Sequence, residues 1–240
     1  MKTIYYAADS TVQFNNYSTF PQTGIGQVLP KFLAYDVRVE NHAKNGRSTK
    51  SFLEEGRFDV IKNEIKAGDF LFIQFGHNDE KKEDAARYTD PNTDFKANLL
   101  CMINAAKEKG ATPVVITAVA RRNFAEDGSV DNKEHEPHAN AARELCAQEG
   151  VALVDLLKMS NEKLAEIGPE KSKDWYMHLP ENVYPYHMEG LADDTHLKYE
   201  GAINYAKLIA QGLYNLGGVY RDLIIKELFE GEWKLIDGRQ

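Results

Sequence analysis

Five short apolar runs are spread along the chain, and each predicts a β-strand. They cover residues 4–8, 37–43, 70–75, 113–119 and 151–155. The run from Phe70 to Phe75 is almost continuously apolar, which is typical of a strand buried on both faces. Strands of this kind lie in the interior of a parallel sheet.

The segments between these runs carry apolar residues at helical spacing. Gly110 and Gly150 follow two such segments, as expected of helix C-termini, and Pro137 suits a first helical turn. We expect helices over residues 25–32, 58–66, 94–109, 137–150 and 199–216, and a C-terminal helical tail over about 219–240.

The alternation of strands and helices predicts the fold class. Helices that connect parallel strands cover both faces of the sheet, so we expect a three-layer α/β/α sandwich around a central, mostly parallel five-stranded sheet. A chain of 240 residues suits one domain over 1–240. The functional site of such a sheet lies at the carboxyl ends of its strands. Two irregular stretches, 121–136 and 168–194, are expected to be loops near that end.

Charge and composition argue against several classes of function. The formal net charge is -8, and no basic face for a nucleic acid is visible. No apolar run approaches transmembrane length, and the first strand leaves no room for a signal peptide. We therefore expect a cytoplasmic protein, or a secreted one if a leader was removed, with no nucleic-acid or membrane partner.

Cysteine and histidine spacing gives no support for a metal site. Cys101 and Cys146 lie in apolar stretches without a CxxC spacing, and we interpret both as core residues. His135 and His138 are spaced like helix-borne ligands, but Pro137 between them breaks such a helix. We interpret these histidines as surface loop residues and expect no metal and no cofactor.

Two polar segments supply a candidate nucleophile and base. Ser10 follows the first strand, and its hydroxyl becomes a nucleophile when a nearby base removes the proton. Asp193 stands three residues before His196, so its carboxylate can orient the imidazole and stabilise its charged form. We choose Asp193 over Asp194 on spacing, and we place the pair in the turn before a helix that begins near Lys198.

Two further segments supply donors for a developing negative charge. Gly46, after the second strand, can present a backbone N–H, and Asn78, after the third, can present a side-chain amide. Nothing in its segment pairs His77 with a nucleophile or an orienting carboxylate at a characteristic spacing. This favours a positioning or packing role over that of a base. Taken alone, each polar segment also fits a turn or a helix cap.

Together these motifs resemble the SGNH/GDSL hydrolase family. The stretches Gly46–Phe52, Glu55–Arg57 and Ile73–Asp79, and Arg121–Arg122 with the loop that follows, are similar to its rhamnogalacturonan acetylesterase branch. The resemblance covers residues 3 to about 216. It implies a flavodoxin-like fold and no metal.

The resemblance also implies a role for each candidate residue. Ser10 matches the family nucleophile, and Asp193 and His196 match the rest of the triad. The backbone N–H groups of Ser10 and Gly46 and the amide of Asn78 match the three oxyanion donors.

The activity implied is that of a serine esterase. It would deacetylate a plant cell-wall polysaccharide or oligosaccharide through an acetyl-enzyme, with rhamnogalacturonan, a pectin, as the leading substrate. Arg47, Arg121 and Arg122 are candidate partners for galacturonate carboxylates. Ala8 replaces the family glycine before Asp-Ser, and we expect packing to adjust without moving Ser10 far.

Three alternatives stay open: an acetylesterase for neutral glycans such as xylan, a lipid or thioester hydrolase, and a non-catalytic glycan-binding protein on the same fold. The natural glycan, the acetyl position and the oligomeric state are not determined by the sequence.

Overall fold

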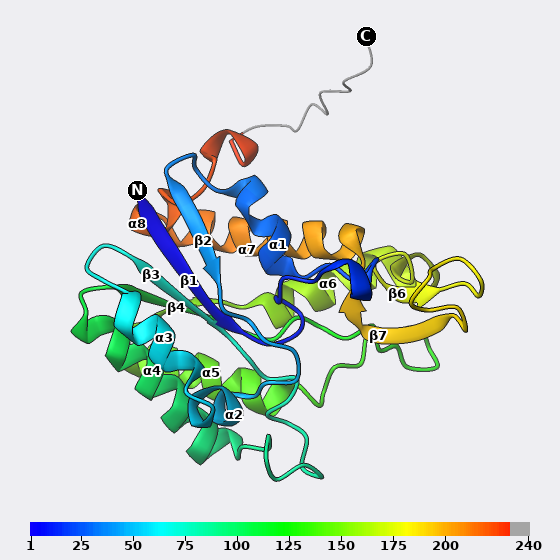
Figure 1. Ribbon diagram of the computed structural model, residues 1–240, viewed down its shortest axis with the longest axis horizontal. Coiled ribbons are helices and arrows are strands. Elements are labelled where there is room, and N and C mark those ends of the chain that lie inside the picture. The colour runs from blue at the N-terminus through cyan, green and yellow to red at the C-terminus, as the bar shows by residue number, and fades with distance from the viewer. Residues whose placement is uncertain (231–240) are drawn as a thin grey trace.

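Five parallel strands form a central sheet in the structure, a computed structural model that describes residues 1–230 (Figure 1). The strand order is β2-β1-β3-β4-β5, and all four pairings are parallel. The strands are β1 (Lys2–Ala8), β2 (Val37–Asn41), β3 (Phe70–Gln74), β4 (Thr112–Ile116) and β5 (Ala152–Val154). The predicted α/β class with a five-stranded parallel sheet is therefore confirmed.

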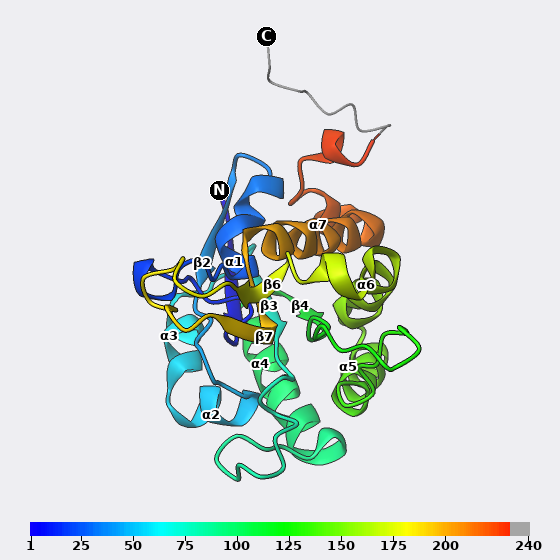
Figure 2. The same ribbon diagram turned by 90° about the vertical axis from the view of Figure 1, so that its right-hand side faces the viewer.

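Helices cover both faces of this sheet, as Figures 1 and 2 show. One layer holds α1 (Ile25–Val28), α6 (Leu156–Ser172) and α7 (Tyr199–Leu216), and the other holds α2 (Thr49–Glu54), α3 (Arg57–Glu64), α4 (Lys96–Glu108) and α5 (Glu136–Glu149). The short elements are α8 (Gly218–Arg221), the 3-10 turns η1 (Tyr17–Thr19), η2 (Leu29–Phe32) and η4 (Lys226–Leu228), and a π-helical turn η3 (Pro91–Phe95).

Strand β3 is buried on both faces, as its apolar run predicts. Phe70 and Phe72 point into the core that β3 shares with α1, α6 and α7, whereas Leu71 and Ile73 point into the core on the side of α3, α4 and α5. Successive side chains of a strand point to opposite faces, so a sheet covered on both sides needs apolar residues at every position. This burial fixes the position at which the loop after β3 leaves the sheet.

Several helix predictions differ from the structure. The segment 25–32 is split between α1 and η2, because Pro30 lies at the start of the second turn. Helices α2 and α6 were not predicted. Helix α6 is interrupted at Gly168, whose φ of 75° lies in the left-handed region. Of the predicted tail, α8 and η4 are helical, and residues 231–240 lie outside the described residues.

The predicted loop 168–194 is wrong in part. Its first residues belong to α6, and the rest contains β6 (Tyr176–Leu179) and the start of β7 (Leu191–Leu197), which form an antiparallel hairpin. Asp193 and His196 consequently lie on a strand and not in a turn before α7. The sequence of β7 hides this strand because aspartates are depleted in strands and no apolar alternation is present.

Three residues differ from the prediction in their exposure to solvent. Cys146 is buried as predicted, but Cys101 is exposed. His135 and His138 are only 2% and 5% exposed, so the interpretation of both as surface histidines is wrong. Pro137 does not break a helix there because it lies in the first turn of α5. Within residues 1–230, no helix is both long and apolar enough to cross a bilayer.

Candidate active site

The turn after β1 carries Ser10 at the carboxyl end of the sheet. The carbonyl of Asp9 accepts hydrogen bonds from the N–H groups of Val12 and Gln13, and its carboxylate accepts from the N–H and hydroxyl of Thr11. These bonds fold the chain back sharply as soon as the strand ends. Ala8 is fully buried at the end of β1, and Ser10 is 6% exposed.

Ser10, His196 and Asp193 form a continuous hydrogen-bonded row. The Ser10 Oγ lies 2.9 Å from Nε2 of His196, and Nδ1 of the same ring lies 2.6 Å from Oδ2 of Asp193. A carboxylate can only accept, so the proton of the neutral ring belongs on Nδ1, and Nε2 is free to accept the serine proton. This is the geometry in which an imidazole acts as a general base toward a serine.

Asp193 is held in its charged form. Burial by itself raises the pKa of this carboxyl. The hydrogen bond from His196 and those from the N–H groups of Thr195 and His196 outweigh burial and hold the pKa well below its usual range. An ionised Asp193 stabilises the imidazolium that forms when His196 takes a proton.

Asp194 points elsewhere, as the spacing argument expects. Its Oδ1 lies 2.7 Å from Nε2 of His178 and 2.8 Å from a guanidinium nitrogen of Arg122. Neighbouring residues of a strand face opposite ways, so β7 gives each of its two consecutive aspartates a different histidine.

Two backbone N–H groups near Ser10 are free to bind an oxyanion. Those of Ser10 and Gly46 have no hydrogen-bond acceptor within residues 1–230. Gly46 has a φ of +76°, a conformation that favours glycine, and a Cβ added there meets no atom within 4 Å. The position therefore requires glycine for its backbone and not for lack of space.

Asn78 is oriented by two neighbours. Its Oδ1 accepts from Arg87 at 3.1 Å, and since a guanidinium only donates, the amide nitrogen must face the other way. One of the two hydrogens on this nitrogen goes to the Arg47 carbonyl at 3.1 Å, which leaves the second for a ligand. Arg87 is a positioning residue that no motif in the sequence indicates.

Asp79 ties the loop of Asn78 to the start of α2. Its fully buried carboxylate accepts from the N–H of Thr49 at 3.0 Å, from the Thr49 hydroxyl at 2.5 Å and from the Thr89 hydroxyl at 3.0 Å. Gly46 lies just before α2, so these bonds set the distance between the two expected oxyanion donors. Burial raises the pKa of Asp79 to about 7, although the hydrogen bonds from Thr49 and Thr89 act against it.

The three arginines proposed for substrate binding all pair with carboxylates of the chain itself. The pairs are Arg47 with Glu55 at 3.0 Å, Arg121 with Glu80 at 2.8 Å, and Arg122 with Asp194 at 2.8 Å. A galacturonate carboxylate therefore competes with carboxylates of the chain, although Glu55 also pairs with Arg57 and offsets only part of the charge of Arg47. This lowers the electrostatic attraction that these arginines can exert.

His77 is buried against the ring of a second histidine. It is 3% exposed, and its ring meets that of His135 edge to face at a centroid distance of 4.7 Å. Burial lowers its pKa well below the usual range, and the neighbouring charges of His135 and Arg121 act in the same direction. One ring nitrogen lies toward the Val119 carbonyl without forming a hydrogen bond of ordinary geometry.

The part of the chain from Ser10 to His196 also matches a known family. The sequence profile of the GDSL-like Lipase/Acylhydrolase family matches residues 9–202. This chain belongs to that family. It is 38% identical to the rhamnogalacturonan acetylesterase RhgT of Bacillus subtilis, over 92% of this chain and 94% of RhgT. It is 42% identical to a probable rhamnogalacturonan acetylesterase, YesY, of the same organism, over 93% and 98%. The chain is a carboxylic ester hydrolase.

Solved structures agree with the fold. The Bacillus subtilis protein YxiM superposes with a TM-score of 0.75 at 28% identity, over 91% of this chain and 57% of YxiM. An acetylxylan esterase from Geobacillus stearothermophilus superposes with a TM-score of 0.59 over 91% of this chain and 95% of its own. Its 13% identity supports the shared fold alone.

The raised pKa of Asp79 predicts a stability that falls as pH rises. The folded chain holds this proton up to about pH 7, whereas the ordinary pKa is 3.8. The stability gained from the proton is complete below pH 3.8 and is lost as pH rises through 7. We expect the free energy of unfolding of wild type, relative to Asp79→Asn, to fall by roughly 1 kcal/mol per pH unit in this window.

Urea unfolding at pH 4, 5, 6 and 7 measures this difference. Asp59→Asn, at an exposed carboxylate of α3, is the control and should run parallel to wild type. Equal pH slopes for wild type and Asp79→Asn would contradict the raised pKa.

Proposed function

We propose that this chain is a serine acetylesterase that removes acetyl groups from rhamnogalacturonan or its oligosaccharides. The observation that carries the proposal is the row Ser10–His196–Asp193 beside two unpartnered backbone N–H groups. The substrate comes from the two Bacillus subtilis relatives, which are named for this activity and align over almost the whole chain.

The reaction proceeds in two acyl transfers. The Ser10 Oγ attacks the acetyl carbonyl carbon while His196 Nε2 takes the hydroxyl proton. The N–H groups of Ser10 and Gly46 and the amide of Asn78 donate to the oxyanion. Collapse of the intermediate expels the sugar oxygen, which takes the proton from His196 and leaves Ser10 acetylated. Water, deprotonated by His196, then releases acetate and regenerates the serine.

Exposed aromatic side chains on two segments that adjoin catalytic residues in the sequence support a sugar substrate. Tyr17 in η1 and Tyr186 between β6 and β7 meet edge to face at 5.5 Å, and they are 71% and 54% exposed. Phe20 and Tyr184 form a second contact between the same two segments at 5.9 Å. Both segments continue directly from catalytic elements, since η1 follows Ser10 and the hairpin loop leads into β7 (Figures 1 and 2). Aromatic rings in such a position suit stacking against the apolar face of a sugar ring.

A comparison of substrates tests the proposal. Purified enzyme is given acetylated rhamnogalacturonan oligosaccharides or acetylated xylan oligosaccharides, and the released acetate is measured. We expect kcat/KM for the pectic substrate to be higher by about tenfold or more. Equal or faster release from xylan would favour the neutral-glycan alternative. If neither substrate releases acetate, the result would favour a glycan-binding protein without activity.

Asn78→Ala is expected to lower kcat for acetyl release by about 10²–10³ while KM changes little, because the lost hydrogen bond acts on the oxyanion and not on the bound ester. Steady-state rates on p-nitrophenyl acetate measure this. The control is Asn104→Ala, which removes an exposed amide on α4. A fall in kcat of less than twofold for Asn78→Ala would exclude the amide as an oxyanion donor.

Tyr186→Ala is expected to raise KM for the oligosaccharide by about two- to tenfold through loss of ring stacking, and to leave hydrolysis of p-nitrophenyl acetate unchanged. Tyr35→Ala is the matched control, since Tyr35 is fully exposed just before β2, at the opposite end of the sheet. If both tyrosine variants behave alike, the aromatic pair has no part in glycan binding.

We propose a role in pectin breakdown, because the two Bacillus subtilis relatives are named as rhamnogalacturonan acetylesterases. The family membership is compatible with lipid or thioester substrates too, and these serve as further esters in the acetate assay.

A further inference from the structure

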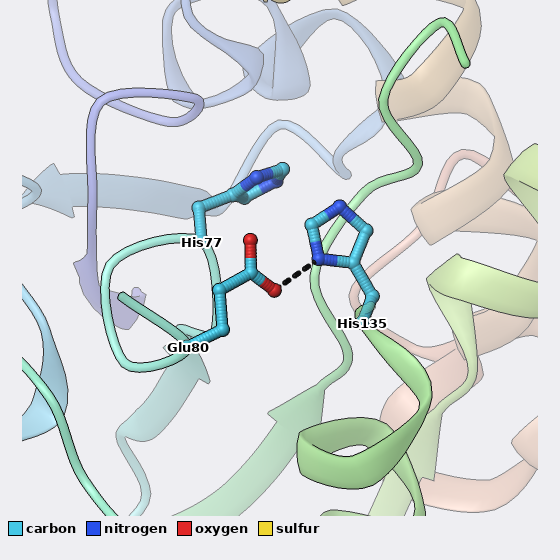
Figure 3. Close-up of side chains that lie close together, drawn as sticks. All are labelled: His77, Glu80 and His135. Atoms are coloured by element: carbon cyan, nitrogen blue, oxygen red, sulfur yellow. Dashed lines mark hydrogen bonds and ion pairs between the residues drawn. The ribbon is translucent and has the colours of Figure 1, made fainter. Parts of the chain in front are cut away.

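Three side chains with metal-binding atoms converge beside the loop of Asn78. His77 and Glu80 come from the loop after β3, and His135 comes from the residue before α5 (Figure 3). One ligand atom from each lies within 4.8 Å of the others. The carboxylate of Glu80 lies beside the two rings, 2.6 Å from Nδ1 of His135 (Figure 3).

The two histidines leave polar atoms without partners in a buried place. Both ring nitrogens of His77 and Nε2 of His135 lack a hydrogen bond within residues 1–230, and the two residues are 3% and 2% exposed. A buried polar group that stays unpaired destabilises the folded state, because it loses its hydrogen bonds to water without replacement. Native structures rarely keep several such groups together unless water or an ion occupies the space between.

The donor set fits a particular class of ion. Two imidazoles and one carboxylate are the ligands of Zn²⁺ and related divalent transition metals, and a water completes the tetrahedron. The second oxygen of Glu80 accepts from Arg121 at 2.8 Å, the kind of outer bond that fixes a ligating carboxylate. Glu134 lies 3.5 Å from the same guanidinium, so Arg121 is balanced by two carboxylates and adds no net positive charge.

A surface pocket adjoins one member of the cluster. Glu80 lines this pocket together with Glu134, Pro137 and His138.

We propose that His77, Glu80 and His135 bind one divalent transition-metal ion of the Zn²⁺ type. The ion takes no part in acyl transfer. It links the loop that carries Asn78 to the first turn of α5 and so stiffens one wall of the active site. The proposal stands independently of the substrate, and it replaces the expectation from sequence that no metal is bound.

Zinc titration of the chelator-treated full chain tests this site. We expect calorimetry to show one saturable equivalent of Zn²⁺, and Tm to rise with Zn²⁺ concentration because the ion binds the folded state. His135→Asn and His77→Gln should weaken this binding by about 100-fold or more. The matched control is His138→Asn, which alters a histidine buried in the same region but hydrogen-bonded to the Thr89 carbonyl, and it should bind as wild type.

Two further measurements keep the outcome clear. Titration of His196→Ala separates this equivalent from ions that bind the triad, and the equivalent should persist. Co²⁺ added to wild type should give the intense visible bands of a four-coordinate site, a result that requires no variant to fold. Any of three results would overturn the proposal: absence of saturable binding, retention of wild-type affinity in both cluster variants, or only the weak bands of six-coordinate Co²⁺. Buried water would then occupy the space between the three side chains.

Discussion

The hydrogen bond between Ser10 and His196 joins residues 186 positions apart, and the chemistry of the site depends on it. Neither residue is positioned for this contact by its own segment alone. Ser10 is fixed by the end of β1 and the turn around Asp9. His196 is fixed by the hairpin of β6 and β7, and the N–H of Thr23 donates to the Leu197 carbonyl at 2.8 Å to bind that hairpin to the segment after Ser10. The sheet supplies one half of the contact and the hairpin the other.

Buried polar groups keep the other donors in place. Asp79 joins the loop of Asn78 to the start of α2, and Arg87 sets the direction of the Asn78 amide. These contacts are made before any substrate arrives, so little reorganisation is needed when negative charge develops on a carbonyl oxygen. The fixed charge of Asp193 serves the same purpose on the side of the base. Preorganisation of this kind explains why so many polar side chains are buried at one edge of the sheet.

The five strands and most helices follow from the sequence because each rests on a local apolar pattern. The strand ends also lead to the prediction that Ser10, Gly46 and Asn78 share one site, since carboxyl ends of parallel strands meet at one edge. The hairpin could not be predicted in this way. Leu191–Leu197 owes its extended form to pairing with β6 and not to its own residues, so Asp193 and His196 were assigned to a turn.

Long-range packing explains the other differences. His135 has no apolar neighbours in sequence, yet α5 carries it under the loop of Glu80, where it is buried. Arg87 lies in a polar stretch whose sequence indicates nothing, and its contact with Asn78 exists only because the loop folds back through Arg87 and Asp84. Contacts of this kind depend on tertiary structure, and a single sequence taken by itself does not reveal them.

Every step of the proposed reaction requires Ser10 to form the covalent intermediate. The decisive experiment is incubation with a serine-reactive organophosphonate, followed by mass spectrometry of the digested chain. We expect one adduct, on the peptide that contains Ser10, together with loss of acetate release in proportion to labelling. Labelling of another residue with equal loss of activity, or full labelling of Ser10 with activity retained, would contradict it.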